Sequence, residues 1–219
     1  MEAFLSALDI TGSPHQQRVI TIATTPAMGA LLMPGLASAL KPTFPQILLH
    51  NIAIVDAARQ LDQRQVDLLI DTHLHSGQAI SHHVLYQDRV QMYCRAGHPA
   101  LDGPQDETTL AEYEFALLLP EGQRYPTLHR RLQEEMGERR CGFSTFNLMT
   151  QAAMIAGSDM LGLTTERLFA MVSRLWPLQT LDFPSLGEEQ IDVALHFNKL
   201  SGKEPLLKEI IETEIGRAS

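Results

Sequence analysis

The stretch from Leu68 to Gly77, LLIDTHLHSG, carries residue types that often hold a catalytic metal ion. Asp71, His73 and His75 end an apolar run, and SHH follows at residues 81–83. Two histidines two positions apart on an extended strand point to the same side, so both rings could bind one divalent metal. The pattern therefore raises the hypothesis of a metal-dependent hydrolase.

The rest of the chain argues against that hydrolase. A His-x-His strand end is similar to the amidohydrolase barrels, whose eight strand–helix units need about 250 residues. Only about 144 of the 219 residues follow His75, and no later strand ends in a His or Asp at a suitable interval. We interpret the histidines as a polar loop after a buried strand, and we expect no metal, no cofactor and no catalytic residue. An adventitious surface metal site is left open, formed by His73, His75, His82 and His83.

Cys94 and His98 in CRAGH raise a second hypothesis, a nucleophilic thiolate paired with an imidazole. Four positions of extended chain separate the two side chains by about 13 Å, too far for the hydrogen bond that such a pair needs. The His98–Pro99 step predicts a turn instead. A phosphate-binding loop is also missing, because GSDMLG has neither the lysine nor the strand–turn–helix setting.

Composition indicates a soluble globular protein with a sizeable core, since 44% of the residues are hydrophobic and 20% are charged. No apolar run approaches the length of a bilayer span. The start, MEAFLSALDITGS, lacks the basic region and the cleavage site of a secretion signal. With only Cys94 and Cys141, the chain is expected in a reducing compartment, the cytoplasm.

The net charge of −9 disfavours nucleic-acid binding by this chain alone, because phosphate contacts need a basic surface. The densest basic segment, HRRLQEEMGERR at 129–140, alternates arginines with glutamates. Such alternation is typical of a solvated helix face.

Strands and helices are predicted to alternate from Arg18 onward. Thr25 and Pro26 form the cap and first residue of the first helix, Pro42 and Pro45 end it, and Asp56 caps the second helix. The predicted strands are 18–24, 46–52, 66–71 and 82–96, and the predicted helices are 24–41 and 56–65. A βαβαβ order predicts a parallel sheet with right-handed crossovers.

A second round of alternating elements follows without a low-complexity linker. Gly157 is expected to end one helix in a left-handed conformation. The predicted strands are 114–120, 141–145, 159–165, 178–183 and 190–197, and the predicted helices are 127–139, 146–157, 166–175 and 204–215. Two α/β lobes of this kind suggest a sensor with a cleft at the carboxyl ends of its strands.

Several segments in order resemble the effector-binding domain of LysR-type transcriptional regulators. They are SPHQQRVITIAT, QRQVDLLID, LYQDRVQMYCRAGHPAL and FSTFNLMTQAAMIAGSDMLGLTTERL. The family's His-Pro-Leu is varied here by Ala100 before Leu101, and its usual Leu-Pro is replaced by Thr164 and Thr165. The resemblance covers nearly the whole chain from about Ser13.

The resemblance implies a type 2 periplasmic-binding-protein-like α/β fold with two Rossmann-like lobes. Two crossover strands, near Gln87–Val90 and Leu195–Asn198, would join the lobes. The implied division is a tail or linker-helix end at 1–17, lobe I at 18–88 and 197–219, and lobe II at 89–196. The family's amino-terminal winged helix-turn-helix has no counterpart among the segments of this chain.

The resemblance also places an effector site at strand ends and helix starts, where unpaired backbone N–H groups favour an anionic or polar group. Arg124 is the cation expected near a bound carboxylate, whereas Asp71 would repel one unless it is paired. The implied effector-binding residues are Thr24, Thr25, Pro26, Asp71, Thr72, Pro120, Arg124, Ser144, Thr145, Phe146 and Thr164.

The sequence thus predicts a ligand-sensing domain of a LysR-type regulator, not an enzyme. It would form a homodimer, with a tetramer possible for a full-length protein. It would contact DNA only through another domain, and it would not bind a membrane. Its effector would act by shifting populations between arrangements. The alternatives are a free solute-binding protein, which shares the fold, and the metal-dependent hydrolase that uses His73 and His75.

Overall fold

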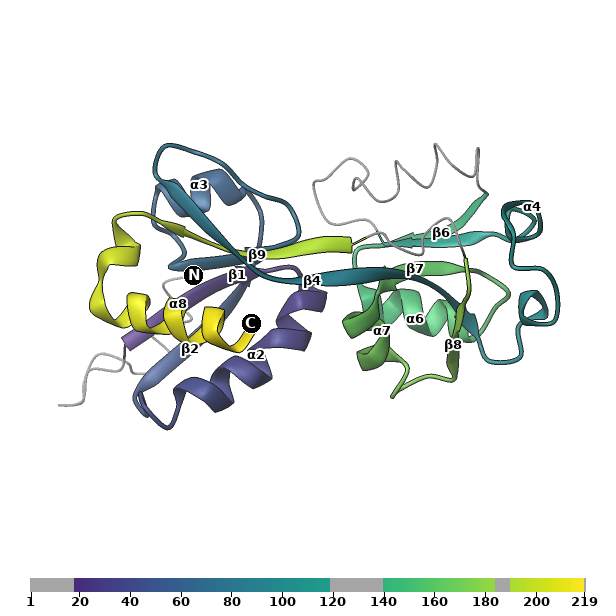
Figure 1. Ribbon diagram of the computed structural model, residues 1–219, viewed down its shortest axis with the longest axis horizontal. Coiled ribbons are helices and arrows are strands. Elements are labelled where there is room, and N and C mark those ends of the chain that lie inside the picture. The colour runs from purple at the N-terminus through teal and green to yellow at the C-terminus, as the bar shows by residue number, and fades with distance from the viewer. Residues whose placement is uncertain (1–17, 119–139, 184–189, 219) are drawn as a thin grey trace, which may run out of the picture. The chain divides into compact units, whose positions relative to one another are not determined.

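The computed structural model describes residues 18–118, 140–183 and 190–218, with side chains as far as Glu212. The described residues form two compact units (Figure 1). Unit 1 comprises 18–24, 28–85 and 194–218, and unit 2 comprises 25–27, 86–118, 140–183 and 190–193. Two long strands, β4 (Ile80–Arg95) and β9 (Gln190–Asn198), each contribute to both units.

Unit 1 has the predicted βαβαβ order. Its elements are β1 (Arg18–Thr24), α2 (Pro26–Leu40), β2 (Ile47–Ala53), α3 (Ala57–Asp62), β3 (Leu68–Asp71), η3 (Ser201–Lys203) and α8 (Pro205–Ala218). β1 pairs in parallel with β2 on one side and with β3 on the other. β9 adds to β3 in the antiparallel direction, with Leu69 opposite His196. The predicted parallel sheet is therefore confirmed, and β9 is its antiparallel addition.

The helices of unit 1 begin where the sequence predicts. α2 starts at Pro26, ends at Leu40, and runs through Pro34, whose missing N–H is tolerated on an exposed part of the helix. The predicted cap of α3 is confirmed, because the Asp56 carboxylate accepts a hydrogen bond from the Arg59 N–H at 3.0 Å. After α3, all four residues of β3 are buried, as the apolar run predicts.

Unit 2 combines antiparallel and parallel pairing. Its elements besides β4 are η1 (Pro99–Leu101), α4 (Glu107–Leu110), β5 (Phe115–Leu118), β6 (Cys141–Thr145), α6 (Leu148–Ala156), β7 (Gly162–Thr165), α7 (Glu166–Val172) and β8 (Leu178–Leu181). β4 pairs antiparallel with β7 and β8, while β5 and β6 are parallel. A core of buried side chains, among them Met92, Phe115 and Leu163, fills this unit.

Some predicted details differ from the structure. Gly157 follows α6 with φ −103°, so the prediction of a left-handed conformation there is wrong. The Gly157 N–H donates to the Met154 carbonyl. The short α4 was not predicted. The predicted tail at 1–17 and helix at 127–139 lie outside the described residues. No helix in the described part is long and apolar enough to span a bilayer.

Candidate functional site

The loop that follows β3 is tied to the sheet of unit 1 by histidines. His75 Nε2 lies 2.8 Å from Asp71 Oδ2, and the His75 backbone N–H donates to His196 Nε2 on β9 at 3.1 Å. The His75 ring meets the rings of His73 and His196 at centroid distances of 4.9 and 5.1 Å. His82 approaches His196 with a centroid distance of 5.7 Å. The buried His196 thus anchors the half-buried His75 of this loop, which lies next to the exposed His73.

His196 is held in its neutral form. The ring is fully buried, and its Nε2 accepts a hydrogen bond, so that nitrogen carries no proton. Burial, followed by the charge of the neighbouring His75, lowers the pKa of His196 to about 4. The side chain therefore serves as a fixed acceptor for the loop, a role that the sequence analysis did not assign to it.

The histidine rings meet edge to face in two of these contacts. Within the ranges that the structure describes, no three His, Cys, Asp or Glu side chains are grouped to hold a metal ion. The adventitious metal site that the sequence left open gains no support from this arrangement.

The carboxyl end of β1 is sealed. Thr24 is 2% exposed, and its hydroxyl accepts a hydrogen bond from the Asn51 amide on β2 at 2.9 Å. The same amide donates to the Ile22 carbonyl at 3.0 Å. A Cβ on Gly29 would lie 2.7 Å from Asn51 Oδ1 and 2.8 Å from Thr24 Oγ1, so α2 approaches β1 closely only because this residue is glycine. Thr24 packs the strand end, while Pro26 is exposed at the start of α2.

Asp71 ends β3 with both carboxylate oxygens in use. Oδ1 accepts the Thr72 N–H at 2.7 Å, and Oδ2 meets His75. With 4% of its surface exposed, Asp71 offers a ligand no free oxygen. The sequence analysis expected Asp71 to repel an anion unless it is paired, and His75 is that partner. Thr72 is exposed next to it.

The end of β6 leads into α6 through a short connection. Ser144 lies within β6, opposite Leu117 of β5, and is exposed; it does not begin a helix. The cap of α6 is Asn147, whose side-chain oxygen accepts the Met149 N–H at 2.8 Å. The predicted strand at 141–145 is therefore confirmed, and the helix predicted at 146–157 begins at Leu148 instead. An Asn directly before an apolar helix was the signal for this cap.

Thr145 and Phe146 connect β6 to α6. The Thr145 hydroxyl accepts the Asn147 N–H at 3.1 Å, so it orders the turn before the helix. Phe146 is 52% exposed, a large exposure for an aromatic side chain. Ser144 and Phe146 are thus the two residues of this predicted trio that unit 2 presents to solvent.

Thr164 lies at the end of β7 opposite Gln91 and is 5% exposed. Its hydroxyl has no hydrogen-bond partner, and the same holds for Thr165. Pro120 and Arg124, the other two residues predicted from lobe II, lie outside the described residues. Their predicted role is untested.

The Cys94 and His98 pair is structural. Burial raises the pKa of Cys94 to about 11, which keeps the thiol protonated and unreactive. His98 is fully buried, with Nε2 3.1 Å from the Asp159 carbonyl and Nδ1 accepting the Ala100 N–H. The predicted turn is present, since His98 caps η1.

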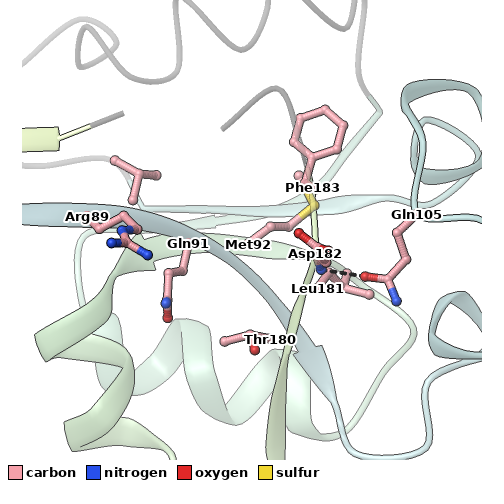
Figure 2. A pocket seen from close by; sticks show the side chains of 9 residues that line it. Arg89, Gln91, Met92, Gln105, Thr180, Leu181, Asp182 and Phe183 are labelled. Atoms are coloured by element: carbon pink, nitrogen blue, oxygen red, sulfur yellow. Dashed lines mark hydrogen bonds between the residues drawn. The ribbon is translucent and has the colours of Figure 1, made fainter. Parts of the chain in front are cut away.

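A pocket of about 350 Å³ in unit 2 opens beside β4 and β8 (Figure 2). Gln91 and Phe183 point to opposite sides of β4, and the Asp182 N–H donates to the Gln105 side chain. None of the predicted effector residues lines this pocket.

Comparisons with known proteins agree with one another. The family model described as the LysR substrate binding domain matches residues 13–213. The uncharacterized HTH-type transcriptional regulator YbeF of Escherichia coli (strain K12) is 45% identical over 212 residues, which are 97% of this chain and 67% of that protein.

Solved structures are similar at much lower identity. A probable transcriptional regulator of Pseudomonas aeruginosa has a TM-score of 0.81 at 17% identity, covering 98% of this chain and 74% of its own. The regulatory domain of CrgA from Neisseria meningitidis has a TM-score of 0.72 at 13% identity, covering 93% and 100%. The regulatory domain of MexT, a transcriptional activator in Pseudomonas aeruginosa, has a TM-score of 0.77 at 11% identity, covering 91% and 99%. At these identities the likeness concerns the fold.

Proposed function

The chain belongs to the family of LysR substrate-binding domains, and from this premise we propose where its effector binds and how binding is transmitted. It is the ligand-sensing domain of a LysR-type transcriptional regulator, and its fold is the predicted type 2 periplasmic-binding-protein-like α/β fold. Regulators of this family bind small-molecule effectors and DNA. The comparisons do not support the solute-binding or hydrolase alternatives.

One group of proposed effector contacts follows the carboxyl ends of β1 and β3, two strands of unit 1. These strands are parallel, so their ends share one edge of the sheet, the edge where α/β proteins bind ligands. Thr25, Pro26 and Thr72 are the proposed direct contacts, because they directly follow the ends of β1 and β3. Thr24 and Asp71, both buried, would hold these contacts in place.

In unit 2 the proposed contacts are Ser144, Thr145 and Phe146 at the end of β6, and Thr164 in β7 is a buried support. The observation that carries this part is the exposure of Ser144 and Phe146 beside the start of α6, a nine-residue helix. Pro120 and Arg124 stay part of the proposal on the strength of the sequence resemblance alone.

The proposed effector is small and polar or anionic. Asp71 leaves no carboxylate oxygen free to face an anion, because the Thr72 N–H engages Oδ1 at 2.7 Å and His75 engages Oδ2 at 2.8 Å. Arg124 would supply the cation for a carboxylate. We propose no catalytic residue and no cofactor for this domain.

A metabolite screen by thermal shift tests the proposed site. A bound effector at 100 times its Kd should stabilise the domain by about 2.7 kcal/mol. Ser144→Ala and Thr72→Ala change exposed side chains and should melt like the wild type, yet each should reduce the effector-induced shift. Arg124→Ala should do the same for a carboxylate effector. Thr43→Ala, an exposed threonine in a turn after α2, should keep the full shift.

A hit that stabilises all of these variants equally would place the effector elsewhere. A reduced shift confined to Ser144→Ala would restrict the site to unit 2, and one confined to Thr72→Ala would restrict it to unit 1. Losses in both variants would support contacts in each unit.

We propose further that the domain acts as a homodimer in the cytoplasm, as a tetramer in a full-length regulator, and reaches DNA through a helix-turn-helix domain. α2 supports the dimer, because none of its fifteen residues is charged. Resemblance to the family pairs this helix with a lobe II helix of a second chain. Effector binding would then shift the population between dimer arrangements.

A further inference from the structure

A second pocket of unit 2, about 450 Å³ in volume, lies between the middle of β4 and the first turn of α7. Its charged lining residues are Asp88, Arg89, Glu166 and Arg167. None of them is among the effector residues proposed above. An inference from this pocket therefore goes beyond the proposed function and stands independently of it.

Asp88 is the unusual member of the lining. Its side chain is 3% exposed, and Oδ1 accepts the Arg167 N–H at 3.3 Å. Oδ2 is buried without a hydrogen-bond partner, and no ion pair to Asp88 is found among the residues that the structure describes. A buried carboxylate oxygen without a donor is costly, so such an atom calls for a partner that the chain does not supply.

Helix capping accounts for only one of the two Asp88 carboxylate oxygens. Thr165 is the N-cap residue of α7 but makes no side-chain capping bond, and Asp88 supplies the missing acceptor from β4 through Oδ1. One oxygen suffices for that role. Two more buried hydroxyls without a hydrogen-bond partner lie on the neighbouring strand β7, because Thr165 is opposite Val90, two residues along β4 from Asp88, and Thr164 is opposite Gln91.

The charge of Asp88 is felt by its neighbour Tyr86. Burial first, and then the negative charge of Asp88, raise the pKa of Tyr86 to about 12. The Arg167 guanidinium lies 3.9 Å from the centre of the Tyr86 ring, where it is held by a cation–π contact and forms no ion pair with Asp88. Asp88 and Arg167 therefore present opposite charges to one pocket without neutralising each other.

The whole lining balances two carboxylates against two guanidiniums. A plain anion would meet Asp88 and Glu166, and a plain cation would meet Arg89 and Arg167. A molecule that carries both charges satisfies both sets. We propose that this pocket binds a small zwitterion of the amino-acid type, whose amino group donates to Asp88 Oδ2 and whose carboxylate pairs with Arg167 and Arg89.

The test is a thermal-shift titration of the wild-type chain with the standard α-amino acids, one at a time. Each is compared with the carboxylic acid that lacks its amino group and with the amine that lacks its carboxylate. At least one amino acid should raise the melting temperature, while its two partial analogues should not. Isothermal titration then gives the Kd of that amino acid.

Asp88→Asn separates the two roles of the side chain. Its amide oxygen can still accept the Arg167 N–H, so α7 keeps its cap, while the charge is lost. We expect near wild-type melting and at least a tenfold increase in Kd. Arg167→Gln, a change at an exposed side chain that leaves Asp88 in place, should weaken binding at least tenfold as well. Asp182→Asn, in the other pocket of unit 2, should leave the Kd unchanged.

Two results would overturn the inference: no amino acid shifts the melting temperature, or Asp88→Asn and Arg167→Gln bind as the wild type does. Asp88 would then be the cap of α7 only. Ser144→Ala distinguishes this pocket from the proposed effector site, because it should leave amino-acid binding intact. Loss of binding in Ser144→Ala with retention in Asp88→Asn would support the effector site and contradict this pocket.

Discussion

In the loop after β3, neighbouring residues determine whether a charged side chain is available to a ligand. In the sequence, Asp71 stands as a negative charge at a strand end where an anion would bind. In the structure both of its oxygens are bonded, to the Thr72 N–H and to His75. His196, more than a hundred residues away along the chain, holds His75 in that position.

His196 should make the stability of the domain depend on pH. Its pKa is about 4 in the folded state and about 6.5 in the unfolded chain, so the unfolded state takes up the proton first as pH falls. The free energy of unfolding should therefore be highest above pH 6.5 and should fall by up to about 3 kcal/mol between pH 6.5 and 4. Urea unfolding at several pH values measures this slope.

The matched variants are His196→Gln and His50→Gln. A glutamine at 196 can accept the His75 N–H but does not titrate. The loss of unfolding free energy between pH 6.5 and 4 that His196 causes should therefore disappear. His50→Gln, on β2 of the same unit, should leave it in place. An unchanged slope in His196→Gln would show that other groups cause the acid sensitivity.

Gly29 and Gly35 form a natural pair for a second residue-scale prediction. A Cβ at Gly29 would collide with the Thr24 and Asn51 side chains, whereas a Cβ at Gly35 meets nothing within 4 Å. Gly29→Ala should therefore destabilise the domain by about 1 to 3 kcal/mol. Gly35→Ala should stabilise it by roughly 0.5 to 1 kcal/mol, because alanine favours a helix. Chemical denaturation measures the free energy of unfolding of both variants. Equal changes in the two would contradict the close packing of α2 on β1.

At the scale of elements, the start of α6 depends on one side chain. Asn147 accepts two backbone N–H groups, from Met149 and Thr150. Asn147→Ala should therefore cost about 1 kcal/mol of stability. Ser144→Ala should cost close to nothing, because Ser144 lies in β6 and is exposed. Thermal melting without ligand compares them, and a larger loss in Ser144→Ala than in Asn147→Ala would contradict the assignment of the cap to Asn147.

At the scale of the whole molecule, the dimer proposal rests on the outer face of α2. Ala30 and Pro34 are exposed there beside the half-buried Leu31 and Met33. Ala30→Glu should raise the dimer dissociation constant at least tenfold by burying a charge at the interface. Light scattering at tens of micromolar measures it. Ala58→Glu, an exposed alanine on α3, is the control, and a purely monomeric wild type would contradict the proposal.

The DNA-binding behaviour of the isolated chain is a second prediction at this scale. With a net charge of −9, it should not bind duplex DNA in a sequence-dependent way at physiological salt. A gel-shift titration with a fixed set of duplexes measures this. Saturable binding to one duplex in preference to the others would contradict it.

The sequence by itself determined the order of elements in unit 1, because each signal there is local. Pro26 starts a helix by its fixed φ, Asp56 caps the next through a neighbouring N–H, and the apolar run at 66–71 is long enough only for a buried strand. The family resemblance rested on the same kind of local pattern, and the comparisons confirmed it.

Only the tertiary structure decided which side chains are available. Thr24 and Asp71 are closed off by Asn51 and His75, and Asp88 keeps one oxygen unsatisfied although its type and spacing in β4 resemble those of any surface acid. Hydrogen bonds between strands join residues that are far apart in the sequence, so a local sequence pattern does not predict them. Burial and pairing therefore emerge only when the strands come together.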